Sequence, residues 1–159
     1  MEKKGIETGL IKVYPDKVLR TKSMEVEKIG HLEKVLFKQM LEIMKAFKGV
    51  GLAAPQIGIS RRLIVVDIGD GPVFLANPRI TKAAGMQVME EGCLSVPETL
   101  VEICRKNEVT VTGINNKGRF VEIKAEGFFA RALQHEIDHL EGKLIIDYMT
   151  FDDKIKFGI

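Results

Sequence analysis

The sequence predicts a single α+β domain, in which antiparallel strands lie between one helix that precedes them and one that follows them. Three observations support this fold class. Apolar residues recur at helical spacing near the start of the chain, the middle consists of short β-branched runs broken by turn residues, and a second helical pattern follows the last run. No internal repeat, low-complexity segment or linker divides the chain.

The first helix is predicted over residues 29–47. Its apolar residues are three and four positions apart and therefore share one face. They are Leu32, Val35, Leu36, Met40, Ile43, Met44 and Phe47. The pattern stops at the sequence GVGLAAPQIG, residues 49–58, where glycines and a proline permit backbone conformations that no helix needs. We expect a loop there.

Strands are predicted between the two helices because the sequence there consists of short runs rich in valine, isoleucine and threonine. The runs are LIVVDI (63–68), PVFLA (72–76), MQVM (86–89), EVTVTGI (108–114) and FVEIKA (120–125). Turn sequences such as GDG, NP and NNKG separate them. We expect antiparallel strands and hairpins.

The second helix is predicted over residues 127–140. Its apolar stripe, which can pack on the sheet, consists of Phe128, Ala132, Leu133, Ile137 and Leu140. Gly142, just beyond the stripe, suits the carboxyl-terminal cap of this helix.

Length and composition indicate an ordinary globular domain. The chain has 159 residues, of which 45% are hydrophobic and 29% charged. The net charge of +2 is small and its cations are dispersed, so we expect no nucleic-acid partner. The first ten residues, MEKKGIETGL, lack the apolar core of a signal peptide, and no apolar run is long enough for a membrane span. A soluble, cytoplasmic protein with reduced cysteines is therefore expected.

The segment HEIDH, residues 135–139, carries the strongest chemical signal. On a helix, His135 and His139 lie one turn apart on the same face and can bind one metal ion, while Glu136 can handle protons for water at that ion. The alternative is a solvated helix face with two histidines by coincidence. Asp138 could accept a hydrogen bond from a histidine or from a neighbouring backbone group.

A third ligand is needed for an open, four-coordinate site. Downstream of His139 the candidates are Glu141, Asp147, Asp152 and Asp153, none of which lies on a convincing second helix. Upstream, Cys93 in EEGCLSVP is the better candidate, because Gly92 lets the backbone bend and Pro97 is expected to end the segment. Its alternative is a buried apolar thiol. Cys104, in a strand-like stretch, is assigned to packing.

Gln56 is the one polar side chain of the loop over residues 49–58. A phosphate-binding loop is a poor interpretation, because the segment lacks the lysine and hydroxyl residues of such loops and follows a helix. The amide of Gln56 could instead donate to an oxygen that gains negative charge as water adds to a carbonyl. The alternative is a turn glutamine that faces solvent.

Taken together, GVGLAAPQ (49–56), EGCLSVP (91–97) and QHEIDHLEG (134–142) resemble the three motifs of the peptide deformylases, in the same order and at similar separations. The resemblance spans nearly the whole chain, and three motifs in register are far more specific than HExxH alone. It implies one catalytic domain over residues 1–159, in which antiparallel β-sheets pack around a central C-terminal metal-binding helix, with a long N-terminal helix. It also implies a hydrolase that removes the formyl group from the N-terminal formyl-methionine of new polypeptides.

The resemblance also implies a role for each motif residue. Cys93, His135 and His139 would bind the metal. Glu136 would be the general acid and base, and Gln56 with the backbone N–H of Leu94 would stabilise the oxyanion. The residues that it assigns to the substrate are Val50, Gly51, Met89, Glu91, Gly92 and Phe128.

The cofactor implied by the resemblance is one divalent metal ion, Fe²⁺ in the cell, with Zn²⁺, Ni²⁺ or Co²⁺ in preparations. One thiolate and two imidazoles suit such ions and leave the centre able to acidify water. The implied partners are the N-formylmethionyl peptides of nascent chains, which places the enzyme near the ribosome.

The sequence departs from the family pattern at three places. Leu100 stands where some members carry an arginine beside the peptide. Lys48 stands where some carry an acidic residue, so an ion pair from that position to Arg105 cannot form. The chain after His139 is too short for the long C-terminal helix of some members, which puts ribosome docking through such a tail in doubt.

Two rival functions remain on the residues alone. The first is a different HExxH zinc peptidase with a carboxylate as third ligand. The second is a non-catalytic, metal-containing peptide-binding domain of the deformylase fold. A structural metal site would be closed by four protein ligands, whereas this sequence offers three good candidates and keeps both Glu136 and Gln56.

Overall fold

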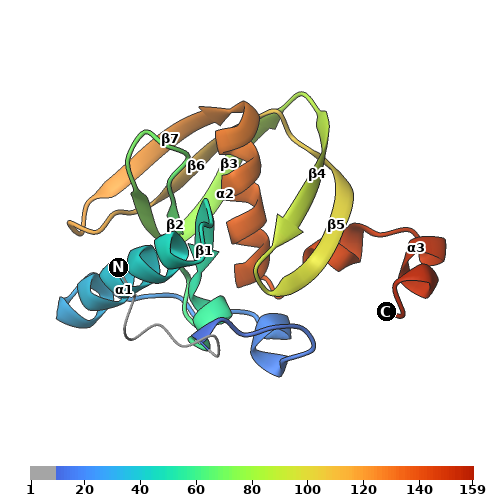
Figure 1. Ribbon diagram of the computed structural model, residues 1–159. Coiled ribbons are helices and arrows are strands. Elements are labelled where there is room, and N and C mark those ends of the chain that lie inside the picture. Colours follow the sequence, from blue (N-terminus) through green and yellow to red (C-terminus); the bar gives the residue numbers. More distant parts are fainter. Residues whose placement is uncertain (1–9) are drawn as a thin grey trace.

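The structure, a computed structural model, describes residues 10–159, and its strands form two antiparallel sheets (Figure 1). The larger sheet has five strands in the order β1-β2-β3-β6-β7, and the smaller one pairs β4 with β5. The strands are β1 (Gly51–Ala53), β2 (Leu63–Val66), β3 (Val73–Ala84), β4 (Gln87–Cys93), β5 (Val96–Arg105), β6 (Glu108–Ile114) and β7 (Phe120–Glu126). The antiparallel strands expected from the sequence are thus present.

Three α-helices and three short 3-10 turns complete the described chain. The helices are α1 (His31–Ala46), α2 (Gly127–Leu140) and α3 (Phe151–Lys156), and the 3-10 turns are η2 (Lys17–Arg20), η3 (Ala54–Ile57) and η4 (Ile145–Tyr148). The two helices predicted over residues 29–47 and 127–140 are confirmed, the second with the predicted bounds. Helix α3 and the 3-10 turns span only four to six residues, which is too few for a repeat of apolar residues to be recognised in the sequence.

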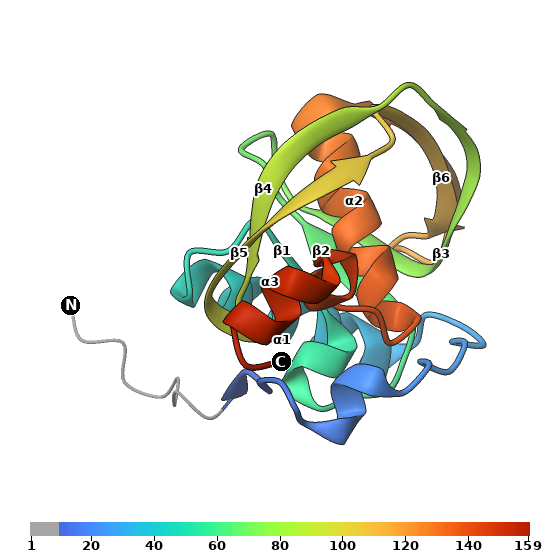
Figure 2. The same cartoon turned by 90° about the vertical axis from the view of Figure 1, so that its right-hand side faces the viewer.

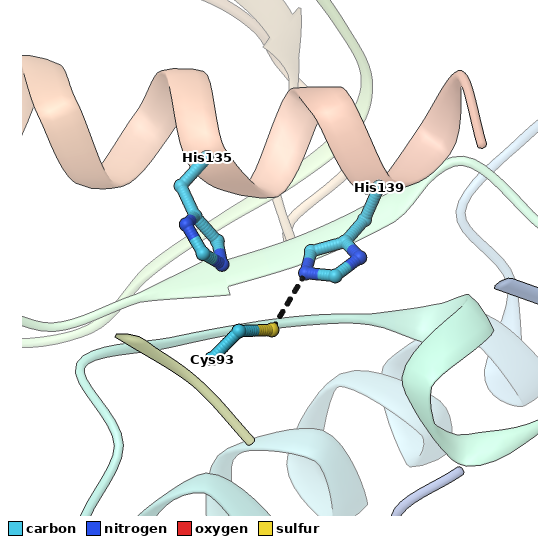
Figure 3. A group of neighbouring side chains, drawn as sticks. All are labelled: Cys93, His135 and His139. Atoms are coloured by element: carbon cyan, nitrogen blue, oxygen red, sulfur yellow. Dashed lines mark hydrogen bonds between the residues drawn. The ribbon is translucent and has the colours of Figure 1, made fainter. Parts of the chain in front are cut away.

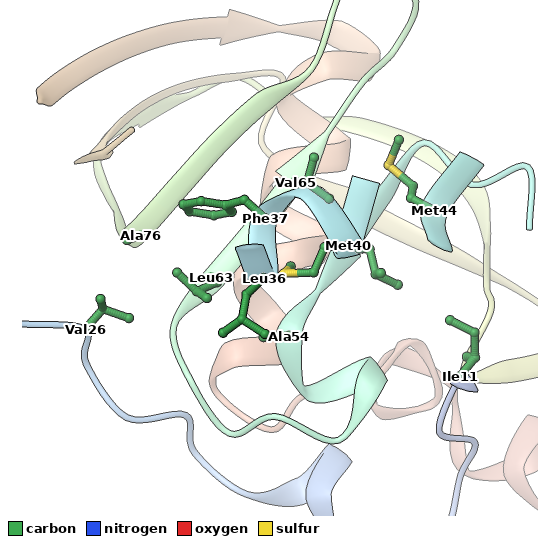
Figure 4. Packing of buried hydrophobic residues seen from close by; sticks show 11 residues of the cluster. Ile11, Val26, Leu36, Phe37, Met40, Met44, Ala54, Leu63, Val65 and Ala76 are labelled. Atoms are coloured by element: carbon green, nitrogen blue, oxygen red, sulfur yellow. The ribbon is translucent and has the colours of Figure 1, made fainter. Parts of the chain in front are cut away.

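Strand β2 is buried on both faces, which explains its unbroken apolar sequence. Because side chains alternate along a strand, Leu63 and Val65 point into the cluster around α1 (Figure 4), whereas Ile64 and Val66 point into the cluster around α2. The β1–β2 end of the five-stranded sheet therefore lies between the two helices.

Helix α2 has the five-stranded sheet on one side and the two-stranded sheet on another (Figure 2). Leu133 and Leu140 are fully buried in the cluster that α2 shares with the larger sheet. The two-stranded sheet, here called the β4–β5 ribbon, has no strand pairing with the larger sheet and meets α2 through side chains. This arrangement leaves one face of α2 for polar groups.

The apolar stripe of α1 differs in detail from the prediction. Leu32 is 57% exposed and lies outside the core. Phe37, which was not assigned to the stripe, is buried and packs on Phe74 with ring centroids 5.3 Å apart. A residue spaced three or four positions from other apolar residues can still lie at the edge of the apolar stripe. Which edge is buried depends on where the rest of the protein packs against the helix.

Three predictions about local structure were wrong. The loop over residues 49–58 contains strand β1 and turn η3. Strand β3 extends eight residues beyond Ala76, with interruptions in its register to β6 that let a long strand bend. Pro97 does not end its segment but is the second residue of β5, a position that tolerates proline because the ribbon has open edges.

None of the helices within residues 10–159 is long and apolar enough to cross a membrane. The segment on which we based the absence of a signal peptide falls, except for its last residue, outside the described part of the chain.

The carboxyl-terminal end of α2 is held by the segment that precedes α1. Ser23 donates its backbone N–H to Leu140, and Arg20 donates from Nη1 to the carbonyl oxygen of Gly142. Gly142 has φ +75°, and a Cβ atom there would lie 2.7 Å from the backbone oxygen of Arg20. Gly142 is therefore required both for its left-handed conformation, as the sequence suggested, and for the close approach of Arg20.

We expect Gly142→Ala to destabilise the protein by more than the cost of a left-handed alanine, which is about 1–2 kcal/mol. The matched control is Gly118→Ala, because Gly118 has φ +77° but its Cβ would make only one ordinary contact, 4.0 Å from Ile29. Equilibrium urea unfolding of the two variants measures the difference. Equal losses of stability would show that the contact with Arg20 contributes nothing.

Candidate active site

Cys93, His135 and His139 converge on one point between α2 and the β4–β5 ribbon (Figure 3). Cys93 is the last residue of β4, where the chain turns so tightly that Cys93 pairs with Val96. Its Sγ lies 3.4 Å from Nε2 of His139, and one ligand atom from each of the three residues lies within 4.8 Å of the others. The imidazole rings are 5.0 Å apart, as expected for histidines one helical turn apart.

Within residues 10–159, this is the one group of three histidine, cysteine or acidic side chains that lie close enough together to hold an ion. Of the downstream carboxylates considered as third ligands, Glu141 pairs with Arg62 at 2.7 Å and Asp147 pairs with Arg20 at 2.6 Å. Asp152 and Asp153 do lie on a further helix, α3, but outside the cluster. The side chain that completes the group of three potential donors is that of Cys93, which the sequence favoured.

Glu136 lies on the same helix with its carboxyl group buried beside this cluster. The residue is 3% exposed, and its Oε1 has no hydrogen-bond partner. Burial raises the pKa of Glu136 to about 7, against the opposing effect of His135 and Arg105. A carboxyl group with a pKa near neutrality can both accept and release a proton.

Gly51 makes the room that the Glu136 side chain occupies. A Cβ atom at Gly51 would lie 2.8 Å from Cδ of Glu136 and closer still to its Oε2. Strand β1 thus runs directly against the carboxyl group, and only glycine fits there without displacing it.

The two histidines lie in different electrostatic surroundings. Burial lowers the pKa of His139 well below its usual value, so its imidazole is neutral and able to bind a metal. Burial also opposes charge on His135, but Glu136, Cys93 and Glu91 outweigh it and raise the pKa of His135. The groups around His135 therefore favour a positive charge at this point, which a bound cation would supply.

Gln56 does not face solvent. It is 2% exposed, and its Oε1 accepts a hydrogen bond of 2.9 Å from the backbone N–H of Ala53. This fixes the orientation of the amide, so that Nε2 points toward Ser95 Oγ at 3.2 Å and Cys93 Sγ at 3.7 Å. The prediction of an amide donor directed at the site fits this geometry.

Glu91 was assigned to the substrate, and its carboxylate is engaged within the protein. The carboxylate is buried and is bonded by His135 Nδ1 at 2.8 Å and by Arg105 at 2.6 and 2.8 Å. Burial alone would raise the pKa of Glu91, yet the hydrogen bonds from Arg105 and His135 lower it to about 2. Glu91 is therefore a permanent anion that orients His135.

Asp138 does not support a histidine, although the sequence allowed that role. Its Oδ2 accepts hydrogen bonds from Tyr148 at 2.6 Å and Arg105 at 2.8 Å. The carboxylate that bonds His135 is that of Glu91 instead. Sequence reasoning missed Arg105, Arg131, Ser95 and Tyr148, because their roles depend on partners 10 to 44 positions away.

A cavity of about 650 Å³ opens onto this cluster. Of the residues expected to bind the substrate, five line it together with Leu94: Val50, Gly51, Glu91, Gly92 and Phe128. Met89 was expected there but is not among the lining residues, and it is 42% exposed on β4. Phe128, predicted in the apolar stripe of α2, is half-exposed at the cavity instead.

A larger hollow of about 860 Å³ lies over β3, β6 and β7, but Cys93, His135 and His139 are not among the residues that line it. Cys104 was expected to pack in the core, and this was wrong. Its side chain is exposed, because the alternation of β5 turns Ile103 and Arg105 inward and Cys104 outward.

The residues around the cluster fit a bound divalent cation. One sulfur and two nitrogen donors face a common point, an open cavity adjoins it, and the buried Oε1 of Glu136 lacks a partner that water at a metal ion could provide. Three protein donors with an open fourth position are typical of a catalytic rather than a structural site.

Comparison with known proteins identifies the family. The sequence model of the polypeptide deformylase family matches residues 9–154. A peptide deformylase of Clostridium botulinum is 52% identical over 140 residues, which cover 88% of this chain and 95% of the relative.

Solved structures agree. The peptide deformylase of Thermotoga maritima superposes with a TM-score of 0.85 at 47% identity and covers 88% of this chain and 96% of its own. That of Synechococcus elongatus, solved in complex with actinonin, has a TM-score of 0.90 at 35% identity and covers 99% of this chain and 87% of its own. On sequence and fold alike, the chain belongs to the peptide deformylase family.

Proposed function

We propose that Cys93, His135 and His139 hold the metal ion with which this chain removes the formyl group from N-formylmethionyl peptides. The observation that carries this assignment is the convergence of the three donors within 4.8 Å beside a buried carboxyl group without a partner. When bound, the ion supplies Lewis acidity, which lowers the pKa of water and polarises the formyl oxygen.

Glu136 is proposed as the group that moves protons. Its buried carboxyl group, with a pKa of about 7, takes a proton from the attacking water and passes it to the amine that leaves. Gln56 Nε2 and the backbone N–H of Leu94 would donate to the oxygen of the formyl group as negative charge develops there. The fixed orientation of the Gln56 amide supports this role, because a preoriented donor need not reorganise during the reaction.

The substrate is proposed to enter the cavity beside α2, with the methionine side chain against Val50 and Phe128 and the peptide backbone along Gly51 and Gly92. These residues line the cavity and combine apolar side chains with accessible backbone. Leu100 lies beside Gly92, which lines the cavity, and its Cδ2 is 3.3 Å from where a Cβ of Gly92 would be. Residues that follow the methionine would thus meet an apolar side chain.

For the metal we propose Fe²⁺ in the cell, with Zn²⁺, Ni²⁺ or Co²⁺ as substitutes in preparations, because a mixed sulfur and nitrogen donor set suits all of these ions. Nascent polypeptides as substrates imply a cytoplasmic enzyme that works near the ribosome. Elemental analysis of protein purified without oxygen would identify the metal.

Replacing Cys93 by alanine should abolish tight metal binding, because the site loses its one anionic donor. Cys104→Ala is the matched control, since Cys104 is exposed on β5 and lies outside the cluster. Metal content after dialysis, measured on both variants, tests the assignment. Equal loss of metal from the two would contradict it.

Glu136→Gln should give a protein that binds one metal ion and formyl-methionyl peptide but turns over at least about 100-fold more slowly, because an amide cannot carry the proton. Glu122→Gln, on the exposed face of β7, should retain full activity. Metal analysis, peptide titration and release of free amine measure the three properties. A Glu136→Gln variant that loses its metal would assign Glu136 a structural role.

Gly51→Ala should displace the Glu136 carboxyl group and lower kcat on the order of 100-fold, as a catalytic group moved by about 1 Å does. Stability should change little, because the added methyl group meets the end of a flexible side chain. Gly30→Ala at the start of α1 is the control, with its nearest new contact at 3.8 Å. Unchanged kcat in Gly51→Ala would show that Glu136 acts from a different position.

A further inference from the structure

Arg131 is a buried cation for which the reaction requires no role. It lies on α2, one turn before His135, and is 2% exposed. A charged side chain removed from water is stable only when its partners replace the lost hydration. The partners of Arg131 should therefore indicate what it does.

Both partners of Arg131 are on strand β4. Its Nη1 donates to Oε2 of Glu91, and its Nη2 donates to the backbone oxygen of Gln87 at 2.9 Å. One guanidinium group thus joins helix α2 to two points of β4 that are four residues apart. A lysine could not make both contacts in this planar arrangement.

The carboxylate of Glu91 also accepts a hydrogen bond from His135, which uses the other oxygen, Oε1. Arg131 and His135 lie one turn apart on the same helical face, so a single carboxylate can reach both. Arg105 contacts Glu91 as well, but it comes from β5, and it also bonds Asp138 of α2 at 2.8 Å. Arg131 is the permanent cation on α2 itself that bonds this carboxylate.

This junction matters because the three metal-binding side chains come from two bodies of structure. Cys93 is on the β4–β5 ribbon, two residues after Glu91, whereas both histidines are on α2. The ribbon is not paired with the five-stranded sheet. Other side-chain bridges join Gln134 to Lys106, Gln87 to Gly127 and Arg105 to Asp138. Their ribbon residues, Gln87, Arg105 and Lys106, lie at the opposite end of the ribbon from Cys93.

We propose that Arg131 is a positioning residue, which holds Glu91 and the β4–β5 ribbon against α2 and so sets the placement of Cys93 relative to His135 and His139. The proposal rests on the metal site assigned above. Arg131 itself touches neither the metal nor the reacting atoms.

The test compares Arg131→Met, which keeps the apolar stem and removes the charge, with Arg131→Lys, which keeps the charge and loses the planar fork. The dissociation constant for Co²⁺ is measured by competition with a chelator, and the Co²⁺ absorption spectrum reports the thiolate bond and the geometry. We expect affinity to fall about 10- to 100-fold in Arg131→Met, as on loss of other groups that orient ligands, and less in Arg131→Lys.

Arg62→Met is the matched control, because Arg62 bonds Glu141 at the carboxyl-terminal cap of α2, at 2.7 Å, and is not part of the cluster. Urea unfolding of the metal-free proteins reports the general loss of stability in each variant. Unchanged Co²⁺ affinity and spectrum in Arg131→Met, or an equal loss of affinity in Arg62→Met, would overturn the proposal. If Arg131→Met fails to fold, the affinity of Arg131→Lys decides by the same comparison.

A double-mutant cycle identifies the route of the effect. If Arg131 acts through Glu91, then Arg131→Met should change Co²⁺ affinity little in a Glu91→Gln background. A full, additive loss there would contradict the route through Glu91. The Co²⁺ spectrum of the wild-type protein tests the metal site separately from the role of Arg131. Absence of a thiolate band in that spectrum would refute the metal site itself.

Discussion

Helix α2 is covered by a sheet on one side and a ribbon on another, and every polar group on its buried faces must find a partner. Gln134 bonds the backbone of Lys106, while Arg131 and His135 share the carboxylate of Glu91. Such pairing is the condition for burying polar side chains at acceptable cost. Three fully buried side-chain atoms of α2 have no hydrogen bond: Nε of Arg131, Oε1 of Glu136 and Nδ1 of His139. The unsatisfied carboxyl oxygen lies where the proposed proton transfer needs a free acceptor.

Glu91 and Glu136 are buried to a similar degree, yet their carboxyl groups behave in opposite ways. Arg105 and His135 hold the pKa of Glu91 near 2, so it stays ionised and can orient its neighbours. Glu136 has no such hydrogen bonds, and burial raises its pKa to about 7. Hydrogen bonds from cations to Glu91, together with the burial of Glu136, therefore separate the supporting carboxylate from the one that can exchange protons.

The partners of Arg105 bear on the departures from the family pattern at Lys48 and Leu100. Arg105 does not need an acidic residue at position 48, because Glu91 and Asp138 already pair with it and Tyr148 stacks beneath it, with the ring centroid 5.1 Å away. Lys48 is left to line the cavity. At position 100 the leucine side chain lies against the ribbon near Gly92. Neither residue belongs to the cluster of Cys93 and the two histidines.

The sequence alone determined the elements and the chemistry that depend on local spacing. Helical periods located α1 and α2, and the four-residue spacing of His135 and His139 predicted a metal site because residues one turn apart share a face. It also favoured Cys93 as the third donor. Only the tertiary structure decided what surrounds these groups: that Glu91 supports His135, that Arg131 is buried, that Cys104 is exposed and that Met89 lies outside the cavity. Each of these depends on which face of a strand or helix another element covers, and long-range packing rather than local periodicity fixes that choice.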